Sequence, residues 1–183
     1  SLDKYSRQFM AMSPFLVIST ANAQGKADVS PRGDPPGFVH AVDDRTILIP
    51  DRPGNNRLDT MVNIVENPNV ACLFFIPGFE DTLRVAGKAR ITDDATLLKH
   101  CVVNGKQPKA GILVSIDEVF LHCAKAFKRS RLWEADAIVD RSAMPSLGKM
   151  ILEQIAPPSK PPTAKEVAEG DEWIEESYKT EMY

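Results

Sequence analysis

The stretch "VACLFFIPGFEDTLRVAGKARI", residues 70–91, predicts two neighbouring strands joined by a turn. Residues 70–76 are a continuous apolar run, which is typical of a strand buried on both faces. Residues 82–91 alternate between apolar and basic side chains, which is typical of a strand with one buried face. The turn signal at 77–81 favours an antiparallel hairpin. The apolar face of the second strand holds Leu83, Val85, Ala89 and Ile91, and its other face holds Arg84, Lys88 and Arg90.

Further strands and short helices are predicted on both sides of this hairpin. The expected strands are 15–20, 27–33, 38–42, 45–50 and 111–123, the last with a bend at Asp117 and Glu118. The expected helices are 2–13, 56–66, 93–103, 142–155 and 163–183. Short turns between strands indicate hairpins rather than βαβ units. The chain is therefore predicted to be mainly β, a β-barrel with flanking helices.

The chain is long enough for one well-buried core but short for two ordinary domains. We expect one unit at 1–140 and a helical extension of it at 141–183, whose last helix docks through Trp173 and Ile174. The net charge of −3 gives no general attraction to nucleic acid. No apolar run is long enough to span a bilayer. The three cysteines, Cys72, Cys101 and Cys123, lack disulfide-framework spacing, so a cytoplasmic protein with no membrane association is expected.

The connection "DRPGNNR", residues 51–57, is the first candidate for a binding site. Asn55 and Asn56 are residue types that cap helices, and the start of a helix exposes backbone N–H groups. Arg57 adds a planar donor that suits phosphate oxygens. These features together predict an anion site. An ordinary capped helix with an exposed arginine explains the same residues, and on this stretch alone it is the commoner case.

Two other polar stretches carry weaker signals. In 29–37, Ser30, Arg32 and Asp34 share one face of a strand that Pro31 places at an edge or a bulge. The segment 122–133 has a cluster of basic residues followed by an aromatic one. It is either a solvated charge run or a basic wall beside an anionic cofactor. Its basic residues are Lys125, Lys128, Arg129 and Arg131.

A metal site is not expected. The pairs His100–Cys101 and His122–Cys123 are separated by a spacing that matches no zinc signature. Neighbouring residues of a strand also point to opposite faces, so one pair cannot easily supply two ligands.

Taken in order, the motifs "SPRGD", "DRPGNNR" and "HCAKAFKRSRLW" resemble the pyridoxamine 5'-phosphate oxidase-like, FMN-binding split-barrel family. The resemblance runs from about residue 13 to residue 133, and it is greatest to the bacterial branch of probable FMN-dependent proteins. It implies a six-stranded antiparallel split barrel with a helical C-terminal tail. It also implies a homodimer that binds FMN at the subunit interface.

The resemblance carries specific site residues onto this chain. It implies that Arg32, Asn55, Asn56 and Arg57 hold the FMN phosphate, and that the backbone from Pro50 to Arg52, including Asp51, lies near the flavin ring. Gly87 is implied as a point of close approach beside the flavin. The segment that completes the site, expected from the other subunit, would contribute Lys125, Lys128, Arg129 and Ser130.

The expected function is that of an FMN-dependent oxidoreductase acting on an unknown small molecule, with no assignable catalytic residue. The chain ends in the acidic "DEWIEESYKTEMY", whereas pyridoxamine phosphate oxidases end in an arginine- and histidine-bearing strand. Oxidation of pyridoxamine phosphate is therefore not expected. The rival hypothesis is a non-catalytic split-barrel dimer that binds haem through His100 and His122 or stores a flavin.

Overall fold

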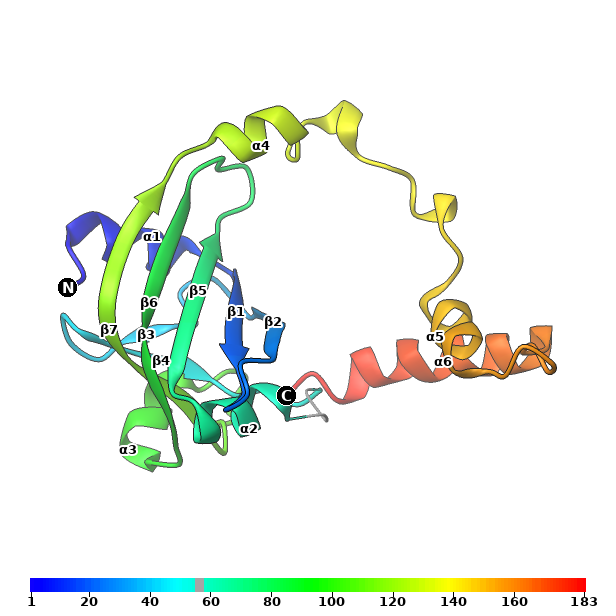
Figure 1. Ribbon diagram of the computed structural model, residues 1–183, viewed down its shortest axis with the longest axis horizontal. Coiled ribbons are helices and arrows are strands. Elements are labelled where there is room, and N and C mark those ends of the chain that lie inside the picture. Colours follow the sequence, from blue (N-terminus) through cyan, green and yellow to red (C-terminus); the bar gives the residue numbers. More distant parts are fainter. Residues whose placement is uncertain (55–57) are drawn as a thin grey trace.

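The computed structural model describes residues 1–54 and 58–183, and its centre is a seven-stranded, fully antiparallel sheet (Figure 1). The strand order is β2-β1-β5-β6-β7-β4-β3. This confirms a mainly β, antiparallel chain with flanking helices. The strands are β1 (Phe15–Ala21), β2 (Ala27–Gly33), β3 (His40–Ala41), β4 (Thr46–Pro50), β5 (Asn69–Phe75), β6 (Thr82–Thr92) and β7 (Gly111–His122).

The seven strands equal the number of strand ranges predicted from the sequence, whereas the family resemblance implied six. The additional strand is β3, a two-residue strand that pairs His40 with Leu48 of β4. It is short because Pro35, Pro36 and Gly37 break the chain before it. The expected hairpin at 38–50 is present, but its first strand contributes little to the sheet.

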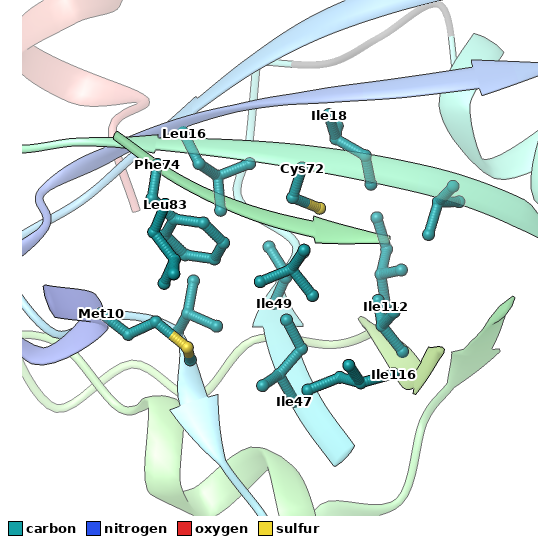
Figure 2. Close-up of a cluster of buried hydrophobic side chains, with 14 of the residues drawn as sticks. Met10, Leu16, Ile18, Ile47, Ile49, Cys72, Phe74, Leu83, Ile112 and Ile116 are labelled. Carbon is teal, nitrogen blue, oxygen red and sulfur yellow. The ribbon is translucent and has the colours of Figure 1, made fainter. Parts of the chain in front are cut away.

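The sheet wraps around one main hydrophobic core. Leu16, Ile18, Phe74, Leu83 and Ile112 are fully buried there, and they come from four different strands (Figure 2). Met10 of the first helix packs against the same core. A smaller cluster beside it joins Leu48, Leu98, Cys101 and Leu113. Each core strand contributes alternate residues, as the pleat requires.

The central hairpin has one face less buried than the sequence predicted. In β5, Val70, Cys72 and Phe74 are buried, whereas Leu73 and Phe75 on the other face are only half-buried. The prediction that this strand is covered on both faces is therefore wrong for a single chain. Its continuous apolar run leaves a partly exposed apolar surface on the outside of the sheet.

The pairing of β6 with β7 contains a bulge where the bend was predicted. Ala86 pairs with Glu118 and Gly87 pairs with Ile116, so Asp117 is the extra residue of β7. A Cβ atom added to Gly87 would lie 2.1 Å from the main-chain oxygen of Ser115. Glycine is needed at this position because the backbone of β7 approaches so closely.

Six α-helices and three 3₁₀ helices of the described residues surround or extend the sheet. The helices before the tail are α1 (Lys4–Met12), α2 (Asp59–Glu66), α3 (Ala95–Leu98) and the 3₁₀ turn Lys99–Cys101. The tail comprises α4 (Lys125–Ser130), 3₁₀ turns Ala135–Ala137 and Arg141–Ala143, α5 (Leu147–Ile155) and α6 (Ala164–Thr180).

The tail leaves the sheet at α4, projects away from it, and returns its last residues to the sheet (Figure 1). Helices α5 and α6 pack together, and the amide of Gly148 donates to Asp171 Oδ1 at 3.0 Å. Of the two expected anchors, Trp173 is 69% exposed and does not dock α6 onto this chain, whereas Ile174 is half-buried. Tyr183 makes the distant contact instead, as described below.

Candidate anion-binding site

A cavity of about 330 Å³ lies where β2 and β4 end. The strands bring Arg32 and Gly33 to one side and Pro50 to the other, and the following loop adds Arg52 and Gly54. These segments are separated in sequence, and they meet because β2 and β4 belong to opposite halves of the wrapped sheet. The cavity therefore brings Arg32 of the 29–37 stretch together with Arg52 and Gly54 of the connection that follows β4.

Arg32 is the most unusual side chain of this cavity. It is only 8% exposed, and its Nη1 donates to Asp51 Oδ1 at 3.0 Å. Its Nε and Nη2 atoms are buried and have no hydrogen-bond partner among the described residues. Leaving buried donors unsatisfied costs about 1–3 kcal/mol each. Such an arrangement is typical of a site that is completed by an anionic ligand.

Arg52 is held in place by two partners on the other side of the cavity. Its Nε donates to Asp34 Oδ2 at 2.6 Å, and its Nη2 donates to the main-chain oxygen of Cys101 at 2.7 Å. The Asp34 side chain is 1% exposed, so the ion pair is well shielded from water. The two arginines thus face one cavity from two different directions, each oriented by an aspartate.

Asp34 has a second partner that lies 149 residues away. The hydroxyl of Tyr183 donates to Asp34 Oδ1 at 2.6 Å, and the guanidinium of Arg52 lies 5.5 Å from the centre of the Tyr183 ring. The hydrogen bond to Asp34, with burial and the negative charge there, raises the pKa of Tyr183. Asp34 was among the predicted polar residues, but Tyr183 was not predicted, because no local pattern links the end of the tail to residue 34.

The helix after this connection begins later than predicted. Helix α2 starts at Asp59, and its N-cap is Leu58, which has a left-handed φ of 56° and makes no side-chain capping bond. The prediction that an asparagine caps this helix is therefore wrong. The three predicted phosphate ligands Asn55, Asn56 and Arg57 lie outside the described residues.

Gly87 does lie at a close approach, but the approaching atom belongs to Ser115 of the same chain. That contact explains the glycine as part of the bulge. The geometry of the described residues gives no separate reason for a ligand there.

The basic segment of α4 is not brought to the cavity by its own chain. Helix α4 follows His122 at one end of β7, whereas Pro50 of the cavity pairs with Gly111 at the other end. Lys128 forms an ion pair with Glu80 at 2.6 Å, and the hydroxyl of Ser130 donates to the main-chain oxygen of Phe127 at 3.1 Å. In this chain the predicted group Lys125, Lys128, Arg129 and Ser130 therefore lies away from the cavity.

The histidines and cysteines that the structure describes are not gathered into a metal-binding group. Among the described residues, no group of three or more His, Cys, Asp or Glu side chains is placed to hold a metal ion. The rings of His40 and His100 are stacked, with their centroids 4.4 Å apart. Burial, and to a smaller extent the charge of His100, lowers the pKa of His40. Burial raises the pKa of the Cys72 thiol to about 12, which makes it unreactive as a nucleophile.

Comparison with known proteins finds a family that matches the part of the chain that forms the sheet. A family model described as "Pyridoxamine 5'-phosphate oxidase" matches residues 2–123. No curated protein sequence matches the chain significantly. The part of the chain that the structure describes contains no helix with the length and apolar character needed to cross a membrane.

Two solved proteins share the fold at low sequence identity. HupZ of Group A Streptococcus superposes with a TM-score of 0.54 at 16% identity, and the match covers 66% of this chain and 94% of the HupZ chain. A Lactobacillus delbrueckii protein named for pyridoxamine 5'-phosphate oxidase superposes with a TM-score of 0.51 at 19% identity, over 65% and 93% of the two chains. At these identities the likeness shows the fold alone.

Proposed function

The chain belongs to the pyridoxamine 5'-phosphate oxidase family, and from this premise we propose that it is an FMN-binding flavoprotein and an oxidoreductase acting on a small molecule. Flavin chemistry resides in the cofactor, so the protein's part is to bind the cofactor, orient it and set its electrostatics. The residues around the cavity at β2 and β4 are suited to that part.

The observation that carries this proposal is the buried Arg32, whose Nε and Nη2 have no hydrogen-bond partner among the described residues. A phosphate monoester would supply the missing acceptors, and a guanidinium binds its oxygens in a planar, two-pronged geometry. Asp51 orients the third nitrogen of Arg32 by the 3.0 Å hydrogen bond. We therefore assign Arg32 to the FMN phosphate, together with Asn55, Asn56 and Arg57, which follow the cavity-lining Gly54 in the sequence.

Arg52 is assigned a different role from Arg32. Its Nε and Nη2 are already bonded to Asp34 and to the main chain at Cys101, so it acts mainly as a fixed positive charge. A fixed positive charge near the flavin ring stabilises the anionic reduced form of the cofactor. Because the salt bridge with Asp34 is shielded from water, Arg52 keeps this position without reorganisation.

The proposed assembly is a homodimer of six-stranded split barrels, with β3 as a minor addition, and with FMN between the two chains. Two features support it. The outer face of β5 leaves Leu73 and Phe75 half-buried, which a partner would cover. The basic residues of α4 lie at the wrong end of β7 to serve their own chain's cavity, so we assign them to the partner's flavin.

The rival function is haem binding or flavin storage without catalysis. In its favour, His122 lines a separate cavity of about 310 Å³ together with Cys123. Against it, the two histidines lie near opposite ends of β7. His100 precedes Cys101, which packs with Leu113 near the start of this strand, whereas His122 is its last residue. One chain cannot bring both histidines to a single iron.

Titration of the apoprotein with FMN, riboflavin and haemin separates these functions. We expect FMN to bind at least about tenfold more tightly than riboflavin, since only FMN carries the phosphate. Light scattering of the FMN-loaded protein should give the mass of two chains. A high-affinity Soret band with haemin, and no preference for FMN over riboflavin, would support the rival function instead.

A further inference from the structure

A second cavity of about 680 Å³ adjoins the anion-binding site and shares Arg52, Pro53 and Gly54 with it. It is closed on one side by Tyr183, which the tail returns to the sheet from a distant part of the chain (Figure 1). Its volume falls in the range of ordinary small-molecule sites, which is roughly 300–1,000 Å³. A molecule in this second cavity would lie directly beside the first.

The charges around the second cavity are unbalanced. Arg52, Lys106 and Lys109 line it. Arg52 is paired with Asp34, and the lining carboxylate Asp51 is paired with Arg32, so the two lysines supply the excess positive charge among the described lining residues. Lys109 is exposed and can adjust to a ligand, whereas the exposed Lys106 also donates to the main-chain oxygen of Tyr183. The local field therefore favours an anion.

The remaining lining is apolar. Pro53, Leu58, Pro108 and the Tyr183 ring supply carbon surface. A site that combines carbon surface with a few convergent polar groups suits a molecule with an apolar body and a single charged end.

Tyr183 is fixed as a wall of this cavity by three contacts. Its hydroxyl donates to the buried Asp34 at 2.6 Å, and its ring lies under the guanidinium of Arg52 at 5.5 Å. Its main-chain oxygen accepts from Lys106 Nζ at 2.7 Å. These contacts join the tail to the same aspartate that orients Arg52, so the tail and the anion-binding site share one hydrogen-bonded network.

We propose that the second cavity is the substrate subsite of the flavin pocket and that it binds small organic anions with an apolar body, held between Lys109 and the ring of Tyr183. This inference rests on the proposed function, because a subsite for a redox substrate has meaning only beside a bound flavin. Tyr183 is a binding residue here and takes no part in a proton transfer.

The experiment uses the full-length protein, with and without FMN, and measures binding by calorimetry. The probes are benzoate and its neutral counterpart benzyl alcohol, which share a ring but differ in charge. We expect benzoate to bind at least about fivefold more tightly than benzyl alcohol and to perturb the flavin absorption band in the FMN-loaded protein. Lys109→Gln should weaken benzoate about fivefold and leave benzyl alcohol unchanged. Lys26→Gln, which removes the same charge from a distant turn, should change neither.

Two further variants test the role of Tyr183 as a wall of the second cavity. Tyr183→Ala should weaken both probes, because it removes the apolar surface that they share, while Tyr183→Phe should retain most of the affinity for benzyl alcohol. FMN affinity should stay within about twofold of the original in Lys109→Gln and Lys26→Gln, because neither variant alters Arg32, Arg52 or the aspartates that pair with them.

The inference is overturned if benzoate binds no better than benzyl alcohol, if it does not bind at millimolar concentration, or if Lys109→Gln and Lys26→Gln behave alike. If FMN binds normally in those cases, the flavin function stands and only the subsite is lost. If FMN fails to bind the original protein, the proposed function fails, and the substrate role of the cavity fails with it.

Discussion

Replacing Arg32 by methionine should separate ligand binding from stability. The side chain is 8% exposed, and two of its nitrogens have no partner among the described residues. Hydrogen bonds to charged groups contribute about 1.5–3 kcal/mol each. Losing one or two such bonds to the phosphate would cost about 1.5–6 kcal/mol, so FMN affinity should fall by at least about tenfold.

We expect Arg32→Met to affect the stability of the apoprotein differently from its affinity for FMN. Methionine removes two buried donors that have no partner among the described residues, and an unsatisfied buried donor costs about 1–3 kcal/mol. It also removes the partner of Asp51, but the side chain of Asp51 is 24% exposed and water can hydrate it. We therefore expect the free energy of unfolding of the apoprotein to stay unchanged or to rise, as measured by urea denaturation.

The assay is fluorescence titration of apoprotein with FMN and with riboflavin. Arg32→Met should weaken FMN and leave riboflavin unchanged, and Arg32→Lys should recover only part of the loss because an ammonium cannot form the planar fork. Arg45→Met, at an exposed turn, is the matched control. Equal weakening of FMN and riboflavin, or a large loss of apoprotein stability, would refute the assignment of Arg32 to the phosphate.

Three other predictions concern the scaffold. Gly87→Ala places a Cβ 2.1 Å from a main-chain oxygen of β7, so it should lower the free energy of unfolding by about 1–3 kcal/mol or more. This loss would be measured as a lower Tm, and an unchanged Tm would contradict the bulge geometry. Cys123 is exposed and Cys72 is buried with a pKa of about 12, so a thiol reagent at about pH 8 should label Cys123 at once and Cys72 only after unfolding. Burial and the charge of His100 lower the pKa of His40, so the unfolded state binds more protons than the folded state. The free energy of unfolding should therefore be highest above about pH 6.5 and should decline as the pH falls through the pKa that His40 has in the folded protein. His40→Gln should flatten that decline, and an unchanged pH profile would remove His40 as its cause.

Alternation and turn signals in the sequence were sufficient for the antiparallel, mainly β architecture. The strands predicted at 15–20, 27–33 and 82–91 are present with small changes of boundary, because a period of two is a local property of the chain. The bend at Asp117 was also readable, since two acidic residues interrupt an apolar run. The burial of 70–76 was overestimated, because a run of apolar residues cannot tell a strand covered within its own chain from one that leaves a face for a partner.

The candidate site depended more on the tertiary structure. The family motifs pointed to Arg32 and Asp51 separately, but only the fold pairs them and leaves two nitrogens of the arginine without a partner among the described residues. The start of α2 moved to Asp59 because a left-handed Leu58 precedes it, which capping preferences did not anticipate.

The sequence by itself determined which residues prefer strands, where the chain turns and which family the motifs resemble, because these depend on neighbours along the chain. Only the tertiary structure decided that Tyr183 meets Asp34 and Arg52 across 149 positions, and that α4 lies at the far end of β7 from the anion-binding site. Contacts between residues so far apart depend on how the sheet wraps and where the tail returns. No local preference encodes either property.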